Sequence, residues 1–146
     1  MSTQTTATAA ASGAFLVNYR IGNSMPGAPS FTVNLVVSAP NKTVNGAGEI
    51  TQAVNPPLNV PTHLSGEYTY MTVMPNNSNI LVTLRGMGPI NPIQPLVANN
   101  TRMWLILSKD WKSGTANYEY RYGKDSSTWQ TVEGVPVTLI PSGNPR

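Results

Sequence analysis

His63 is the only histidine of the chain, and histidine is the side chain that most often acts as a general acid or base near neutral pH. Glu67 follows four residues later, so the two could form a catalytic pair or a two-ligand metal site. No GxSxG, HExxH or Asp-rich motif accompanies them, and the chain has no cysteine. We therefore expect no catalytic residues, no metal site and no cofactor, with a hydrolase that uses His63 as the least favoured reading.

Carboxylates are also scarce, because the chain has only six Asp and Glu residues. A glycosidase needs two of them facing each other across a sugar ring, and no local pattern suggests such a pair. Glu119 and Arg121 share one face of a predicted strand, where they could form an ordinary exposed ion pair. The inventory favours a protein that is not an enzyme.

Aromatic residues gather in the last third of the chain. Trp111 lies between Lys109 and Lys112 in a predicted turn, where burial is least expected. Aromatic side chains on a β surface can stack on sugars or line a ligand cup. The candidate ligand-binding residues are Lys109, Trp111, Lys112, Tyr118, Tyr120 and Tyr122. The alternative for the three tyrosines is that they form the core face of one strand.

Nine Lys and Arg against six Asp and Glu give a net charge of +3, but the bases are scattered without a cluster. Nucleic-acid binding needs them on one face, so we expect no nucleic-acid partner. Residues 1–12 carry neither a basic start nor an apolar run, and we expect a disordered tail without a signal peptide, which makes the cytoplasm the default location. No apolar run reaches the length of a transmembrane helix.

The elements that must position these residues are strands, because apolar and polar residues alternate with period two along most of the chain. Gly46 and Gly48 suggest a bulge in one strand, and the proline-rich segment 55–61 is predicted to be a linker. The segment 102–108 is almost wholly apolar, which predicts that both its faces are covered. The predicted strands are 14–21, 31–37, 44–53, 64–74, 80–84, 102–108, 115–122, 128–132 and 135–140.

Two hairpins are predicted, one joining 64–74 to 80–84 and one formed by the last two strands around Glu133-Gly134. Helical periodicity is absent. Residues 13–141 are therefore predicted to form a single all-β domain, an antiparallel β-sandwich or β-barrel of about eight or nine strands, followed by a short tail at 142–146.

Four phrases resemble a known family: GAFLVNYRIGNSMPGAP, NKTVNGAGEITQAVNPPL, YMTVMP and DWKSGTANYEY. They are similar to a group of small proteobacterial proteins classified only as a domain of unknown function, over roughly Ser12 to Ile140. The resemblance implies a bacterial source and an uncharacterised single domain. It supplies no catalytic or binding residues.

Taken together, these features favour a binding or interaction protein that uses loops or an aromatic face. The sequence does not identify its ligand or protein partner, and a carbohydrate or a small amphiphile is a candidate ligand. The alternative is a structural or assembly subunit that forms homo-oligomers. Charged residues make up only 10% of the chain, so few charges blunt the edges of its strands against pairing with another copy.

Overall fold

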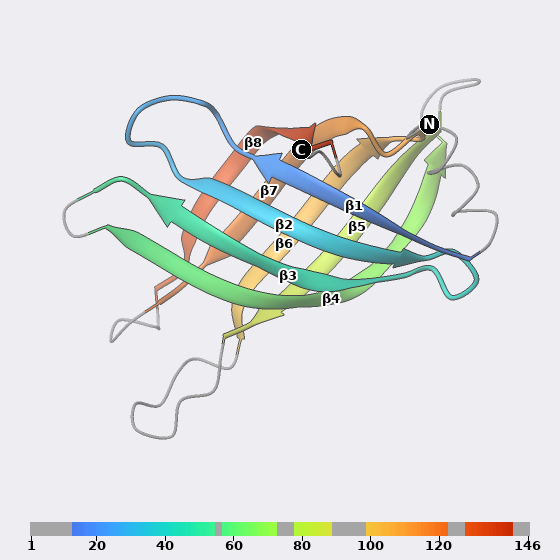
Figure 1. Cartoon of the computed structure of the whole chain (residues 1–146), viewed down its shortest axis with the longest axis horizontal. Helices are drawn as coiled ribbons and strands as arrows, with labels where there is room; N and C mark the ends of the chain where they lie inside the picture. The colour runs from blue at the N-terminus through green and yellow to red at the C-terminus, as the bar shows by residue number, and fades with distance from the viewer. Residues whose placement is uncertain (1–12, 55–56, 73–77, 89–98, 123–127, 142–146) are drawn as a thin grey trace.

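The computed structural model describes residues 13–54, 57–72, 78–88, 99–122 and 128–141. Within these ranges the chain contains strands and no helix, and the strands close into one antiparallel barrel (Figure 1). The prediction of an all-β fold is confirmed, and of its two alternatives the barrel is the one observed. The strands are β1 (Ala14–Ile21), β2 (Ser30–Ser38), β3 (Thr43–Gln52), β4 (Leu58–Thr72), β5 (Ser78–Met87), β6 (Asn99–Ser108), β7 (Ser113–Tyr120) and β8 (Gln130–Leu139).

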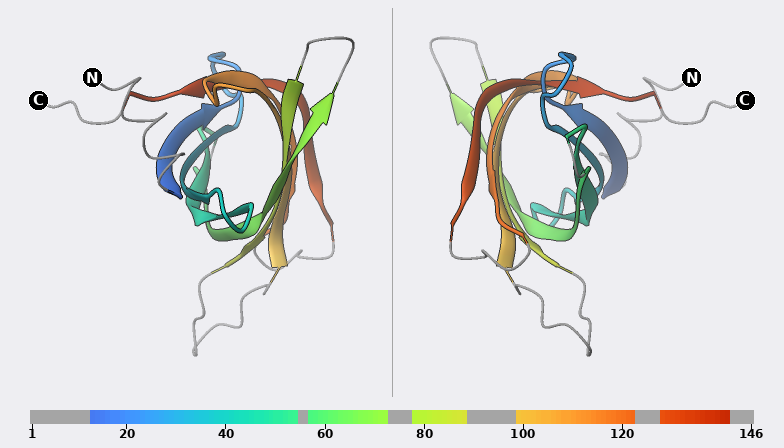
Figure 2. Two further views of the ribbon diagram at one scale, coloured as in Figure 1. Left: turned by 90° about the vertical axis from the view of Figure 1, so that its right-hand side faces the viewer. Right: turned by 90° about the vertical axis from the view of Figure 1, so that its left-hand side faces the viewer.

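Each strand pairs with the next in the sequence, and β8 returns to β1. The views in Figure 2 show the strands enclosing one interior. The closing ladder is short, because β1 is in register with β8 only over Tyr19–Ile21. One further backbone hydrogen bond lies at each end of it, from the Ile140 amide to the Asn18 carbonyl at 2.8 Å and from the Gly22 amide to the Pro136 carbonyl at 3.0 Å. The barrel is therefore closed at a narrow seam.

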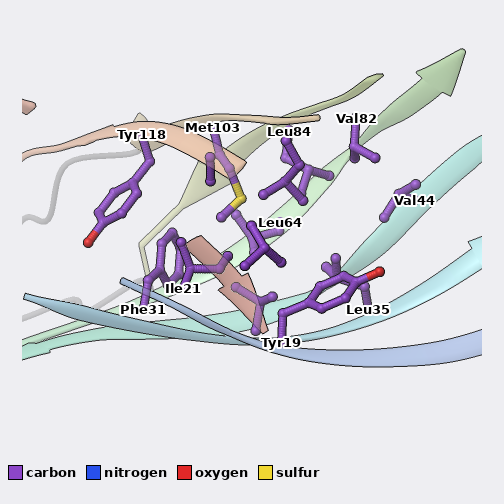
Figure 3. Close-up of a cluster of buried hydrophobic side chains, with 14 of the residues drawn as sticks. Tyr19, Ile21, Phe31, Leu35, Val44, Leu64, Val82, Leu84, Met103 and Tyr118 are labelled. Atoms are coloured by element: carbon purple, nitrogen blue, oxygen red, sulfur yellow. The ribbon is translucent and has the colours of Figure 1, made fainter. Parts of the chain in front are cut away.

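Period-two alternation places one face of every strand inside the barrel. In β2 the residues Phe31, Val33, Leu35 and Val37 are buried, whereas the residues between them are exposed. Figure 3 shows side chains of this kind meeting in the interior from several strands. An eight-stranded barrel is just wide enough for its own side chains to fill, and each fully buried large apolar side chain contributes about 1.5–3 kcal/mol. A packed interior thus holds the fold together.

The predicted C-terminal hairpin is wrong, because Gln130–Leu139 is one strand. Gly134 has a positive φ of 64°, and its amide donates to Oδ1 of Asn117 at 2.6 Å. The register with β7 shifts between Ala116 and Tyr118. The Glu133-Gly134 step that suggested a turn is therefore at an irregularity within β8, which is why the described residues form eight strands and not nine.

The predicted proline linker is also wrong in part, since β4 begins at Leu58 and includes Pro61. Pro61 is opposite Glu49 of β3, but the ladder between β4 and β5 begins only at His63. A proline without an N–H is tolerated because no β5 partner lies beside it. The bulge predicted in β3 is absent as well: β3 keeps continuous register with both neighbours.

At Gly46 the missing side chain allows a close approach instead of a bulge. A Cβ atom there would lie 2.0 Å from the Asn34 carbonyl oxygen of β2. The glycine therefore lets two paired strands bend tightly against each other. The predicted hairpin of β4 and β5 is confirmed, and its residues Ile80, Val82 and Leu84 are buried as predicted. The tip of the hairpin at 73–77 is outside the described residues, as are the two predicted tails at 1–12 and 142–146.

Candidate functional site

The six predicted binding residues are divided between the interior and the surface. Trp111 is buried with 6% of its surface accessible, so the prediction of an exposed tryptophan is wrong. Its neighbours Lys109 and Lys112 are exposed, as is Tyr122, whereas Tyr118 and Tyr120 are buried. The structure therefore does not bring these residues together as one surface.

Trp111 packs into one end of the barrel. Its ring lies edge-on against Phe15 at 5.3 Å and Tyr68 at 5.0 Å between centroids, and its carbonyl accepts a hydrogen bond of 2.7 Å from the Tyr19 hydroxyl. Its φ of 65° is unusual for a bulky residue and costs of order 1 kcal/mol or more. The aromatic contacts offset that cost, so Trp111 serves packing.

The turn that carries Trp111 is fixed by hydrogen bonds. The Trp111 amide donates to the Ser108 carbonyl at 2.9 Å, and Asp110 accepts from the Ser108 hydroxyl and the Lys112 amide. The bond from Ser108 is the main reason that the pKa of Asp110 lies below its usual range. The carboxylate is therefore engaged in shaping the turn.

The tyrosines of β7 lie nearer the opposite end of the barrel, and the alternative interpretation of them as a core face is confirmed for Tyr118 and Tyr120. Phe31 packs edge-on against Tyr118 at 5.0 Å, and Tyr120 stacks with the exposed Tyr122 at 6.0 Å. The Tyr118 hydroxyl is buried and has no hydrogen-bond partner among the described residues. Burial raises the pKa of Tyr118 and, to a lesser degree, that of Tyr120.

The outer face of β6 departs from prediction in the other direction. Met103, Leu105 and Leu107 point inward and are buried, but Trp104 and Ile106 point outward with 38% and 43% of their surfaces accessible. The prediction that both faces of this strand are covered is therefore wrong. An apolar outer face that folding does not bury marks a place where another molecule can bind.

A groove of about 440 Å³ lies beside this face, on the outside of β4 and β5. We call it the outer groove, and define it by its lining residues Ser65, Gly66, Glu67, Tyr68, Thr69, Leu81, Thr83 and Arg85. Thr83 is directly opposite Trp104, and Leu81 is opposite Ile106. The groove thus offers hydroxyl groups, one acidic side chain (Glu67) and one basic side chain (Arg85). They lie next to the aromatic ring of Trp104 and the aliphatic side chain of Ile106.

Charges at one end of this face are arranged differently from the prediction. Glu119 pairs with Arg102, at 3.3 Å between Oε1 and Nη1, and not with Arg121. The guanidinium groups of Arg102 and Arg121 both lie over the Trp129 ring, at 4.0 and 4.4 Å from its centroid. Trp129 therefore makes cation–π contacts with both arginines.

His63 and Glu67 are both exposed on the outer face of β4. Four residues along a strand separate their Cα atoms by about 13 Å, beyond the reach of a hydrogen bond between the side chains. Among the described residues, no group of three or more Asp, Glu or His side chains could hold a metal ion. Within the described ranges, the outer groove is accordingly the better candidate for a site.

Comparison with known protein families identifies the family of the chain. It matches the family described as a domain of unknown function, DUF1842, over residues 12–129. The chain belongs to the DUF1842 family. The match confirms the resemblance read from the sequence and includes β1 to β7 but ends just before β8. A search of the curated proteins returned no match.

The DUF1842 domain described here is thus an eight-stranded barrel with aromatic clusters in its interior. In the part of the chain that the structure describes, no helix is long and apolar enough to cross a bilayer. The residues of the outer groove were missed by sequence reasoning. Only the register between β4, β5 and β6 brings them together, and no local pattern carries that register.

Proposed function

We propose that this DUF1842 domain is a non-enzymatic binding protein that holds a carbohydrate on the outer face of β4, β5 and β6. The observation that carries the proposal is Trp104, a partly exposed indole opposite Thr83 of the outer groove. The interior is occupied by the barrel's own side chains, so a ligand is better accommodated outside.

The chemistry of the groove suits a sugar. A sugar ring has a C–H face, which stacks on an aromatic ring, and hydroxyl groups at its rim, which need donors and acceptors. Trp104 and Ile106 offer the apolar platform, while Ser65, Thr83 and Glu67 offer the polar groups. The combination favours a carbohydrate over a purely apolar amphiphile.

Binding is favoured over hydrolysis by the spacing of the carboxylates on this face. Glu67 of β4 and Glu119 of β7 are three strands apart and two positions out of register, because Glu67 is in line with Asn117; this corresponds to roughly 16 Å between their Cα atoms along the sheet. Glycosidases place their two carboxyl groups roughly 5–9.5 Å apart. This spacing supports a ligand that is held and not cleaved.

The test is calorimetric titration of the chain with a panel of oligosaccharides, with indole fluorescence as a second readout. We expect at least one binder, and about tenfold weaker binding for Trp104→Ala, since stacking on an aromatic ring contributes of order 1 kcal/mol or more. Val36→Ala is the matched control, because Val36 is an exposed apolar residue of β2, on the other side of the barrel.

Absence of binding across the panel would overturn the proposal. So would a binder that Trp104→Ala and Val36→Ala weaken equally, since the ligand would then not lie on β6. A panel of lipid vesicles run in parallel identifies an amphiphile as the ligand if only that panel binds.

One observation favours a second function, that of an assembly subunit which pairs with another copy through β1. Among the described residues, Ala14–Val17 of β1 lie beyond the ladder to β8, and the apolar Leu16 within this segment has 69% of its surface accessible. Unpaired strand edges are templates for pairing. Light scattering tests this: we expect a dimer that Leu16→Lys dissociates, and a monomer at every concentration would overturn it.

A further inference from the structure

Three arginines gather at one end of the outer face of β5, β6 and β7. Arg85 of β5 is directly opposite Arg102 of β6, and Arg121 follows β7. Like charges placed opposite each other on neighbouring strands are destabilising. We call Arg85, Arg102 and Arg121 the arginine cluster.

The cluster is only partly neutralised. The single ion pair found there among the described residues joins Arg102 to Glu119, which leaves two positive charges in excess. The guanidinium group of Arg85 has no hydrogen bond or ion pair with any described residue, and it also lines the outer groove. Arg85 therefore connects the cluster to the groove, and none of its guanidinium donors is used by a residue that the structure describes.

The other two guanidinium groups are held in place. Arg102 and Arg121 both lie over the Trp129 ring, and Nε of Arg121 donates to the Asn99 carbonyl at 2.7 Å. Each guanidinium has five N–H donors, and these contacts use few of them. Donors fixed before binding lose less entropy when an anion arrives, and guanidinium groups match carboxylate and sulfate oxygens in pairs.

We propose that the arginine cluster binds the carboxylate or sulfate groups of an acidic carbohydrate whose sugar rings lie in the outer groove. The inference rests on the proposed function and adds the charge of the ligand to it. The positive cluster is complementary to such a group, while the hydroxyls of Ser65 and Thr83 meet uncharged parts of the sugar.

A nucleic acid is less well matched to this face. Glu67 lies in the groove and Glu119 beside the cluster, so a continuous phosphate backbone would meet two carboxylates. Phosphate tracking needs an uninterrupted basic stripe. A carbohydrate with spaced acidic groups avoids this repulsion.

The experiment titrates the full chain with dextran, a lightly sulfated dextran and hyaluronate, with a single-stranded oligonucleotide as a fourth ligand. Hyaluronate carries a carboxylate on alternate sugars, so its acidic groups are spaced. Dextran and lightly sulfated dextran share one backbone, so their difference reports the sulfate groups alone. We expect the lightly sulfated dextran, hyaluronate or both to bind, at least tenfold more tightly than dextran.

Arg85→Gln is expected to weaken that binding about tenfold, the loss typical of one charge-assisted contact. The matched control is Arg20→Gln, which removes the same charge from the exposed face of β1. It should leave affinity within about twofold. Circular dichroism and thermal melts of both variants check that the barrel still folds.

The outcomes separate the two proposals. Neutral sugars bound as tightly as acidic ones would overturn the acidic ligand but keep the carbohydrate site. If Arg85→Gln and Arg20→Gln weakened binding of the acidic carbohydrate equally, the loss of affinity would come from the net charge of the protein. That result would overturn the arginine cluster as a binding site. Binding of the oligonucleotide alone would overturn both proposals, as would the absence of any binding.

Discussion

Trp111 and Trp104 sit within eight residues of each other, yet the barrel uses them in opposite ways. Trp111 lies in a turn between two lysines and is buried, whereas Trp104 lies in an apolar run and is partly exposed. The first closes one end of the interior, and the second borders the outer groove. Local composition therefore misleads at both positions, and the topology of the barrel decides which tryptophan stabilises and which remains available.

The largest expected effect is the difference between Trp111→Ala and Trp104→Ala in free energy of unfolding. Removing the Trp111 ring leaves a cavity against Phe15 and Tyr68, which should cost about 3–5 kcal/mol. Trp104→Ala should cost about 1 kcal/mol, because its ring is only partly covered. Urea denaturation with the slope compared between variants measures both values.

Equal losses for the two variants would contradict the comparison. The Trp104 ring would then belong to the folding core, and its exposure would no longer indicate a binding surface. The intrinsic fluorescence offers an independent check, because emission from Trp111 should be the better shielded from solvent.

A finer comparison uses two buried hydroxyl groups. Tyr19→Phe removes the donor to the buried Trp111 carbonyl and should cost about 1–2 kcal/mol. Tyr118→Phe removes a hydroxyl for which the described part of the chain offers no hydrogen-bond partner, and it should be neutral or slightly stabilising. Thermal melts of the two variants side by side decide the sign. A Tyr118→Phe variant as destabilised as Tyr19→Phe would mean that this hydroxyl is hydrogen-bonded.

Much of the fold could be predicted because a barrel repeats a simple rule. Each strand alternates inward and outward residues, so the sequence of β1, with Phe15, Val17, Tyr19 and Ile21 in alternation, is enough to place it. The same alternation predicted the hairpin of β4 and β5. Whether a segment forms a strand depends mainly on its own residues, so the alternation within that segment is enough to predict it.

Features that depend on neighbours could not be predicted. Pro61 continues a strand only because β5 ends before reaching it, and Gly134 interrupts β8 without ending it because β7 continues beside it. The buried position of Trp111 depends on Phe15, almost a hundred residues away. No local signal includes these partners.

The outer groove belongs to the same category. Arg85, Glu67 and Trp104 come from three strands, and their juxtaposition requires the registers of two ladders. Composition gave the opposite impression, since scattered bases suggested that no cluster forms. A register that places Arg85 opposite Arg102 creates a cluster from residues seventeen positions apart.

The smallest expected effect is a loss of stability at alkaline pH that distinguishes interior from surface tyrosines. Burial raises the pKa of Tyr19 and Tyr118 in the folded barrel above the value of about 10 that holds in the unfolded chain. Because the folded pKa is the higher one, each contributes stability that is complete below pH 10 and declines as the pH rises further. Half a pH unit above 10, the loss should be roughly 0.8 kcal/mol for each buried tyrosine.

Unfolding titrations with and without Tyr118→Phe measure this loss of stability. The variant should show a shallower alkaline decline, and an unchanged slope would mean that Tyr118 ionises as readily inside the barrel as outside it.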